Sequence, residues 1–177
     1  MQVFLRFFNR TIFEHFPIEY QLEILGESES APKEFNYVGN AFERMVYYHG
    51  AHDIGHALQG LALVGCSSFA AQSDKTTDGK LLIGRNFDFY VGDEFAKQKE
   101  ILLCKPNKGN KFVIITWPGF VGCVSGMNEK GITVTLNASK SDVPTHTATP
   151  IAILAREILQ YASTTNDAWI IAQKHQT

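Results

Sequence analysis

Between residues 61 and 137 the sequence alternates short apolar runs with groups of turn-forming residues, and this pattern constrains the fold most. The runs have the length of strands rather than of helices. Asp78-Gly79 and Pro118-Gly119, which separate some of them, are typical of tight turns. We expect sequential antiparallel strands formed by LALVGCSSFAA, LLIG, ILLC, FVIITW, VGCVS and ITVTLN.

The segment before these strands has helical periodicity. Asn40 and Glu43 have the spacing of a capping box. Apolar residues recur behind them at intervals of three and four until Gly50, which predicts a short helix over 41–49. A second helix is expected to begin at Asp53.

Helical periodicity returns after the strands. Apolar residues at helical spacing follow Pro150, a residue favoured in the first turn of a helix. Helices that are separated in sequence from an antiparallel sheet indicate an α+β fold. The chain stops at KHQT, within or just after its last predicted helix. We therefore expect the sheet to be incomplete in this chain.

The charge and hydropathy patterns exclude two classes of partner. Lys and Arg number 16 and Asp and Glu number 18, so the net charge is −2 and offers no basic footprint for nucleic acid. No apolar run approaches the ~20 residues that a membrane-spanning helix needs. We expect no nucleic-acid partner and no membrane span.

The three cysteines, Cys66, Cys104 and Cys123, are an odd number and contain no CxxC pair. This pattern argues against a disulfide framework and against a zinc ribbon. At least one thiol is free, as is usual in a reducing compartment. The N-terminal stretch MQVFLRFFNR also lacks the small-residue cleavage site of a signal peptide, so a cytoplasmic location is favoured.

His52 and His56 lie four residues apart, as the two histidines of the HExxH zinc motif do. Asp53 stands where that motif has Glu, and no third ligand is apparent, so we interpret both as solvated or capping histidines. A zinc enzyme stays as an alternative that metal analysis decides. No pattern distinguishes the other histidines, His49 among them. The sequence contains neither GxGxxG nor GxxxxGK, and we predict no metal and no cofactor.

Cys66 has two interpretations. Free cysteines are among the most buried residues, so one is a structural thiol in a buried strand. The other is a reactive thiol, because Arg85 and Asp88 follow the apolar run LLIG closely. Charges that point inward need partners, and an Arg beside a thiol favours the thiolate, which is the reactive form. An exposed ion pair between Arg85 and Asp88 is the alternative.

Residues 65–139 contain three blocks in succession, GCSSFAA, DGKLLIGRNFDFY and GMNEKGITVTLNAS. In this order and spacing they resemble the choloylglycine hydrolase and isopenicillin-N acyltransferase group of N-terminal-nucleophile (Ntn) hydrolases. The resemblance implies a four-layer αββα sandwich, of which this chain holds only part. It also implies that a C-terminal half, or a second chain of the same precursor, completes the sheet and the active site.

The resemblance further implies that the enzyme processes itself. Members of the acyltransferase branch cut their own chain at a Gly-Cys bond, which here is Gly65–Cys66. Residues 1–65 would then be a helical propeptide, and residues 66–177 the N-terminal half of the Ntn-hydrolase domain. In the bile-salt branch the Cys directly follows the initiator Met. The long segment before Cys66 therefore places this sequence nearer the acyltransferase branch.

The family pattern implies a catalytic role for four residues. Cys66 would be the nucleophile and, through its freed α-amino group, also the base. Arg85 would stabilise the thiolate, and Asp88 would hold the amino group. Asn137 would donate its side-chain N–H to the oxyanion of the tetrahedral intermediate.

The implied reaction breaks linear, non-peptide amide C–N bonds of a small molecule through an acyl-thioester on Cys66. Attack by water makes the protein an amidohydrolase, and attack by an amine makes it an acyltransferase; both stay open. The alternative is a truncated, non-catalytic fragment of this fold that is inactive alone.

Overall fold

The structure is a computed structural model of the 177-residue chain, and it describes residues 11–57, 64–89, 92–137 and 148–175. The helical segments are η1 (Ile12–His15), α2 (Ile18–Ser28), η2 (Lys33–Phe35), α3 (Ala41–Ala57), η4 (Ser73–Lys75), α4 (Asp93–Lys97), α5 (Ile151–Tyr161) and α6 (Thr165–Gln173). The strands are β1 (Val64–Ala71), β2 (Leu82–Phe89), β3 (Glu100–Cys104), β4 (Phe112–Thr116), β5 (Ser125–Asn128) and β6 (Thr133–Thr135). Within the described ranges, no helix has both the length and the apolar character needed to cross a membrane.

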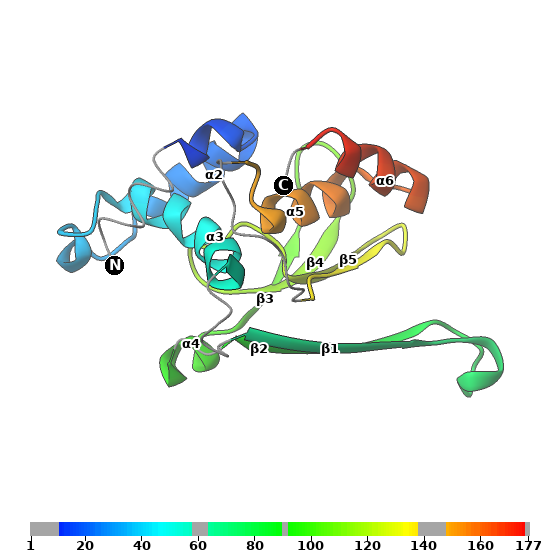
Figure 1. Cartoon of the computed structure of the whole chain (residues 1–177). Helices are drawn as coiled ribbons and strands as arrows, with labels where there is room; N and C mark the ends of the chain where they lie inside the picture. The colour runs from blue at the N-terminus through cyan, green and yellow to red at the C-terminus, as the bar shows by residue number, and fades with distance from the viewer. Residues whose placement is uncertain (1–10, 58–63, 90–91, 138–147, 176–177) are drawn as a thin grey trace.

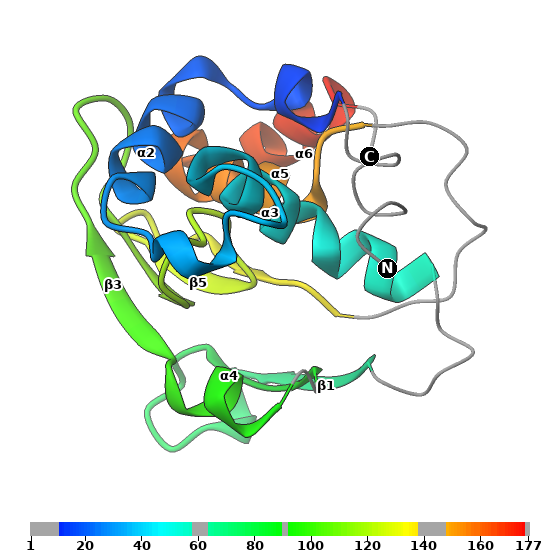
Figure 2. The same cartoon turned by 90° about the vertical axis from the view of Figure 1, so that its left-hand side faces the viewer.

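The strands form two antiparallel sheets. β3, β4, β5 and β6 pair in sequential order as a meander, and β1 and β2 form a long hairpin. Helices α2, α3, α5 and α6 lie on one side of the four-stranded sheet, and the hairpin lies on the other (Figure 1). The view turned by 90° shows the same layering, with α4 beside the hairpin (Figure 2). The prediction of an α+β fold is confirmed.

Helix α5 packs its apolar face onto the four-stranded sheet. Leu159 is buried against Phe112, Ile114 and Cys123. Because alternate residues of a strand point to opposite faces, Ile115 of the same strand is exposed on the far side. One face of the sheet is therefore covered by helix, and the other carries apolar side chains in contact with solvent.

Asn128 ties the turn between β5 and β6 to the end of α5. Its buried side chain donates to the carbonyls of Leu159 and Ala162, at 2.9 and 2.7 Å. It also accepts from the backbone N–H groups of Lys130 and Ile132, at 3.0 Å each. Asn128 is the Asn of the GMNEKG block, so this part of the motif fixes a turn against a helix.

Several polar contacts attach the N-terminal helices to the rest of the chain, and two of them come from Glu23 and His49. Glu23 of α2 forms a two-point ion pair with Arg156 of α5, at 2.8 and 3.2 Å. In α3, the fully buried imidazole of His49 accepts from the backbone N–H groups of Val121 and Gly122, at 2.9 and 3.2 Å. Arg156 donates to the carbonyl of the same Val121 at 2.7 Å, so both contacts meet at one loop.

The helix predicted over 41–49 begins as expected and ends later. The capping box is confirmed, because Asn40 accepts from the Glu43 N–H at 2.9 Å and Glu43 accepts from the Asn40 N–H at 3.1 Å. The predicted end at Gly50 is wrong: α3 continues to Ala57 and includes the start of the second predicted helix.

The strand predicted over 121–125 is wrong. Residues 121–124 are buried but irregular, and β5 begins at Ser125. The Val124 carbonyl accepts from the Leu136 N–H, just after β6, at 3.0 Å, whereas the backbone of Val121, Gly122 and Cys123 bonds to helices. One such bond joins the Cys123 N–H to the carbonyl of Ala152 at 2.8 Å.

Candidate active site

The β1–β2 hairpin carries the predicted nucleophile and its charged neighbours. Its register pairs Cys66 with Phe87 and Gly65 with Asp88. Residues directly opposite in an antiparallel pair share a face, and alternate residues of a strand point to opposite faces. Cys66 and Arg85 therefore lie on one face of the hairpin, and Asp88 lies on the other.

An aromatic cluster attaches the Cys66 face of the hairpin to the rest of the molecule. The ring centres of Phe87 and Trp117 are 5.7 Å apart, and Trp117 stacks on Phe95 at 4.3 Å. Away from this cluster β1 is largely exposed, and Phe69 has 58% of its surface in solvent. The expectation of a buried strand is wrong for most of β1.

Arg85 reaches from the hairpin to the four-stranded sheet. One Nη atom donates to the Ser125 hydroxyl at 2.7 Å. The other Nη lies 3.7 Å from the Cys66 sulfur and also donates to the Leu136 carbonyl. The guanidinium carbon lies 4.5 Å from the centre of the Phe87 ring. The cation is thus held by contacts from both sheets.

The guanidinium of Arg85 has lost part of its hydration. Burial lowers the pKa of Arg85 from its ordinary value, and a negative charge on Cys66 would act in the opposite direction. Its Nε–H is buried without a hydrogen-bond partner in the described part of the chain. A partly desolvated cation gains from an anion beside it. The Arg85 guanidinium is therefore suited to stabilise a negative charge that develops beside it.

Asp88 lies beside Gly65, on the face of the hairpin opposite the Cys66 side chain. The Asp88 side chain is exposed, and one carboxylate oxygen is 3.6 Å from the position that a β-carbon on Gly65 would occupy. The structure therefore places the carboxylate beside the Gly65–Cys66 segment, on the face of the hairpin opposite the thiol.

Asn137 directly follows Leu136, whose carbonyl accepts a hydrogen bond from Arg85. Its side chain is exposed, and its amide nitrogen donates to the Thr135 hydroxyl at 3.2 Å. Within the residues that the structure describes, the side-chain amide of Asn137 forms hydrogen bonds with Thr135 and none with Cys66. Through the Leu136 carbonyl, Arg85 nevertheless links the strand before Asn137 to the hairpin that carries Cys66.

The other two cysteines have less reactive surroundings. Cys123 is fully buried, and burial raises its pKa to about 12. Cys104 is half-buried, and burial raises its pKa as well. A thiol with a raised pKa stays protonated at neutral pH and is a poor nucleophile. Of the three cysteines, Cys66 is the one that contacts a cation on an accessible face.

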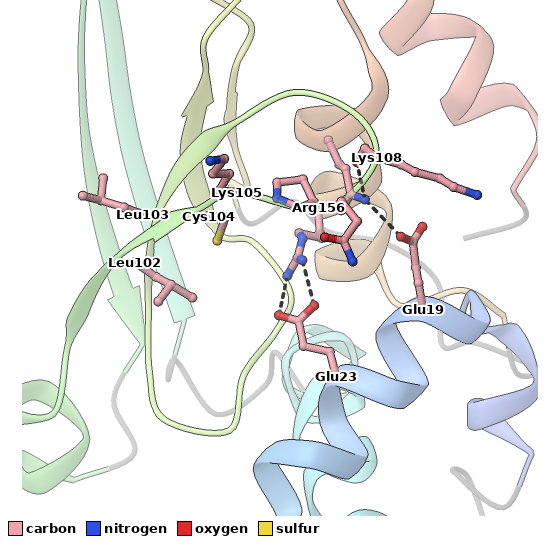
Figure 3. A pocket seen from close by; sticks show the side chains of 11 residues that line it. Glu19, Glu23, Leu102, Leu103, Cys104, Lys105, Lys108 and Arg156 are labelled. Carbon is pink, nitrogen blue, oxygen red and sulfur yellow. Dashed lines mark hydrogen bonds and ion pairs between the residues drawn. The ribbon is translucent and has the colours of Figure 1, made fainter.

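A pocket of about 550 Å³ lies elsewhere, between α2, α5 and the segment that follows β3 (Figure 3). The Arg156–Glu23 ion pair forms part of its wall, and Cys104 lies at its edge. No residue of the β1–β2 hairpin lines it. Its Glu19 carboxylate already accepts from Gln160 at 3.0 Å. We therefore do not assign the chemistry of Cys66 to this pocket.

Sequence reasoning did not single out two groups that hold Arg85, the Ser125 hydroxyl and the Leu136 carbonyl. A serine before a glycine carries no recognisable pattern, so only the tertiary structure reveals it. His49 was also missed, because a lone histidine in a helix has no distinguishing spacing. The side chains of His52 and His56 lie outside the described residues, although both positions belong to α3.

Two curated proteins are similar to part of this chain. An uncharacterized protein of Archaeoglobus fulgidus is 33% identical over 111 residues, which are 59% of this chain and 18% of that protein. Protein dcd1B of Dictyostelium discoideum is 28% identical over 116 residues, which are 64% of this chain and 23% of that protein. The chain spans less than a quarter of the length of either relative.

A family model matches the C-terminal part of the chain. The model describes acyl-coenzyme A:6-aminopenicillanic acid acyl-transferase and matches residues 75–177, which are more than half of the sequence. The matched segment begins after Cys66 and contains Arg85, Asp88 and Asn137. The chain therefore belongs to the acyl-coenzyme A:6-aminopenicillanic acid acyltransferase family, within the isopenicillin-N acyltransferase and choloylglycine hydrolase group of Ntn hydrolases.

Proposed function

We propose that this chain is the cysteine-bearing part of an Ntn amidohydrolase or acyltransferase, with Cys66 as the nucleophile. The observation that carries the proposal is the Arg85 guanidinium 3.7 Å from the Cys66 sulfur. A cation at this distance favours the thiolate, which is the form that attacks acyl groups. Membership of an acyltransferase family supports acyl transfer as the reaction class.

The proposed nucleophile is exposed by self-cleavage of the Gly65–Cys66 bond. This bond lies within β1, and Gly65 places no side chain on the face where the Asp88 carboxylate lies. Cleavage would separate a propeptide, residues 1–65, from a catalytic part that begins at Cys66. The freed α-amino group has an ordinary pKa of about 8 and can act as a base at neutral pH. Asp88 can then accept a hydrogen bond from it.

In the proposed reaction the Cys66 sulfur attacks the carbonyl carbon of a small-molecule amide or other acyl donor, and the thiol proton passes to the α-amino group. Asn137 turns from Thr135 and donates to the oxyanion, a contact worth roughly 3–4 kcal/mol. The α-ammonium returns the proton to the leaving amine as the C–N bond breaks. Water or a second amine then attacks the acyl-thioester and frees Cys66.

We also propose that a further sheet completes an αββα sandwich. The face of the four-stranded sheet opposite α5 carries Ile101, Leu103, Ile115 and Met127, which are 74%, 81%, 45% and 49% exposed. Contiguous apolar surface of this kind is usually covered in the working protein. Relatives much longer than the matched segment support additional polypeptide of the same precursor as the cover.

An acylation assay tests the proposed nucleophile. The protein is mixed with p-nitrophenyl esters of acyl groups of increasing length, and the bound acyl group is located by peptide mass spectrometry. We expect release of nitrophenol and an acyl group on Cys66, with neither in Cys66→Ala. Cys123→Ala is the matched control and should be acylated like the wild type.

Acylation of Cys66→Ala at the wild-type rate contradicts the proposal. The assay also separates the catalytic enzyme from the non-catalytic fragment. Acylation of a longer product of the same gene, but not of the 177-residue chain, shows that the additional polypeptide is needed. A folded longer product that is never acylated favours the non-catalytic alternative.

A further inference from the structure

We propose that Ser125 is a positioning residue for the nucleophile, because its hydroxyl holds the Arg85 guanidinium in the orientation that contacts Cys66. The inference rests on the proposed role of Cys66. It adds a residue that lies outside the three motif blocks, on the other sheet from the nucleophile.

The geometry gives Arg85 two fixed points. The Ser125 hydroxyl accepts from one Nη at 2.7 Å, while the other Nη lies 3.7 Å from the Cys66 sulfur. The guanidinium is planar and rigid, so holding one nitrogen sets the direction of the other. The Leu136 carbonyl binds the same nitrogen that faces the sulfur. The Phe87 ring lies against the face of the guanidinium, and the Ser125 hydroxyl is the hydrogen-bond acceptor that holds its other nitrogen.

Ser125 is well placed for this task because its own position is fixed on both sides. It pairs with Ile115 of β4 and with Thr135 of β6, so it lies on an inner strand of the sheet. Groups that orient a reactive side chain act best from such rigid elements. As a neutral acceptor, the hydroxyl orients the cation and leaves its charge available to the thiolate.

A shape-matched pair of variants isolates the hydroxyl. Ser125→Thr keeps it, whereas Ser125→Val has nearly the same shape and lacks it; both suit a strand. Thr133→Val on the neighbouring β6 is the control for loss of a half-buried hydroxyl from this sheet. The measurement is the rate at which iodoacetamide alkylates Cys66, followed by peptide mass spectrometry so that Cys104 and Cys123 are counted separately. Rates are taken at about pH 7 and at about pH 10, where an ordinary thiol is largely ionised.

We expect Ser125→Thr and Thr133→Val to match the wild type at both pH values. Ser125→Val should be about tenfold slower at neutral pH, which is the loss expected for a hydrogen bond to a charged group. Near pH 10 its rate should return to the wild-type rate, because the thiolate then forms without help. Where Ser125→Val does not fold, Ser125→Ala serves in the same comparison.

Two results overturn the proposal. One is equal rates for Ser125→Val and Ser125→Thr at neutral pH. The other is an alkylation rate that falls by the same factor at both pH values, which indicates altered access of iodoacetamide to Cys66 rather than altered ionisation of its thiol. The variant Arg85→Met distinguishes failure of the proposed role of Ser125 from failure of the proposed function of Cys66. If Arg85→Met also reacts at the wild-type rate, the site assignment itself is wrong; if it is slow while Ser125→Val is fast, only the role of Ser125 is wrong.

Discussion

One Nη atom of Arg85 lies 3.7 Å from the sulfur of Cys66, although the two residues are 19 positions apart in the chain. The hairpin register produces this proximity, because it places Arg85 two residues from the partner of Cys66 and on the same face. The same guanidinium binds Ser125 and the Leu136 carbonyl. A single side chain therefore joins the two sheets at the candidate nucleophile.

The proposed role of Asp88 predicts that Asp88→Asn impairs chemistry more than stability. The substitution keeps the shape and removes the charge that would hold the α-amino group of Cys66. We expect acylation of Cys66 to fall by about a hundredfold or more, as for other general-base partners. Because Asp88 is exposed, the melting temperature should change little.

Asp74→Asn, at an exposed ion pair near the far end of the same hairpin, is the control and should leave acylation unchanged. Acylation of Asp88→Asn at the wild-type rate would show that this carboxylate is only a surface group.

The buried imidazole of His49 predicts sensitivity to acid. Its Nε2 accepts from two backbone N–H groups, and its Nδ1 lies 2.7 Å from the Met45 carbonyl, so the neutral ring with the proton on Nδ1 fits the site. Burial lowers the pKa of His49 from 6.5 to about 4. The unfolded chain therefore takes up this proton at a higher pH than the folded chain does. The free energy of unfolding should fall as pH decreases from 6.5 toward 4, by up to about 3 kcal/mol.

Urea unfolding of the wild type and of His49→Gln across this pH range measures the effect. Glutamine can accept hydrogen bonds at the same place but does not titrate, so the free energy of unfolding of His49→Gln should depend less on pH. Because glutamine does not have the shape of the buried imidazole, this free energy should also be lower overall. Parallel pH dependences in the two proteins would refute the role of His49.

The Glu23–Arg156 ion pair should contribute measurably to stability. Arg156 is 4% exposed and Glu23 is 34% exposed, so Glu23→Gln leaves a buried cation without its anionic partner. Loss of one partner of a fully buried pair costs about 3–5 kcal/mol; because Glu23 is partly solvated, we expect about 1–3 kcal/mol. Thermal unfolding should show a melting temperature several degrees lower.

Glu94→Gln is the matched control, since Glu94 and Lys97 form an ion pair of 2.7 Å that is exposed on both sides. Its melting temperature should equal that of the wild type. Equal effects of Glu23→Gln and Glu94→Gln would mean that the α2–α5 contact is held by apolar packing alone.

Local sequence signals predicted the elements whose stability is local. The Asn40–Glu43 capping box and the apolar face of α5 depend on neighbours within one or two turns, and both are present. Gly50 misled the prediction because α3 is held by a distant contact: His49 is buried against the loop at Val121. A glycine that costs about 1 kcal/mol in a helix is outweighed by such burial.

The apolar pattern of residues 121–125 correctly indicates burial but not strand pairing. The Cys123 N–H bonds to the carbonyl of Ala152, and the Val121 carbonyl accepts from Arg156, so helices supply partners that a neighbouring strand would otherwise supply. The Val124 carbonyl alone among these three residues accepts from a residue beside a strand, the N–H of Leu136. The contribution of Ser125 to the candidate site depends on how two sheets meet. No spacing within the sequence encodes that arrangement, whereas the Cys66 and Arg85 motifs lie on adjacent strands of one hairpin and were within reach of sequence reasoning.

Intact-mass spectrometry of the freshly purified full-length gene product tests the central claim, that Cys66 is a self-generated N-terminal nucleophile, most directly. We predict one fragment that ends at Gly65 and one that begins with Cys66, and a single uncut chain for Cys66→Ala. Cys104→Ala is the control and should be cut like the wild type. A folded wild-type protein that stays intact, or a Cys66→Ala variant that is still cut at this bond, would contradict the claim.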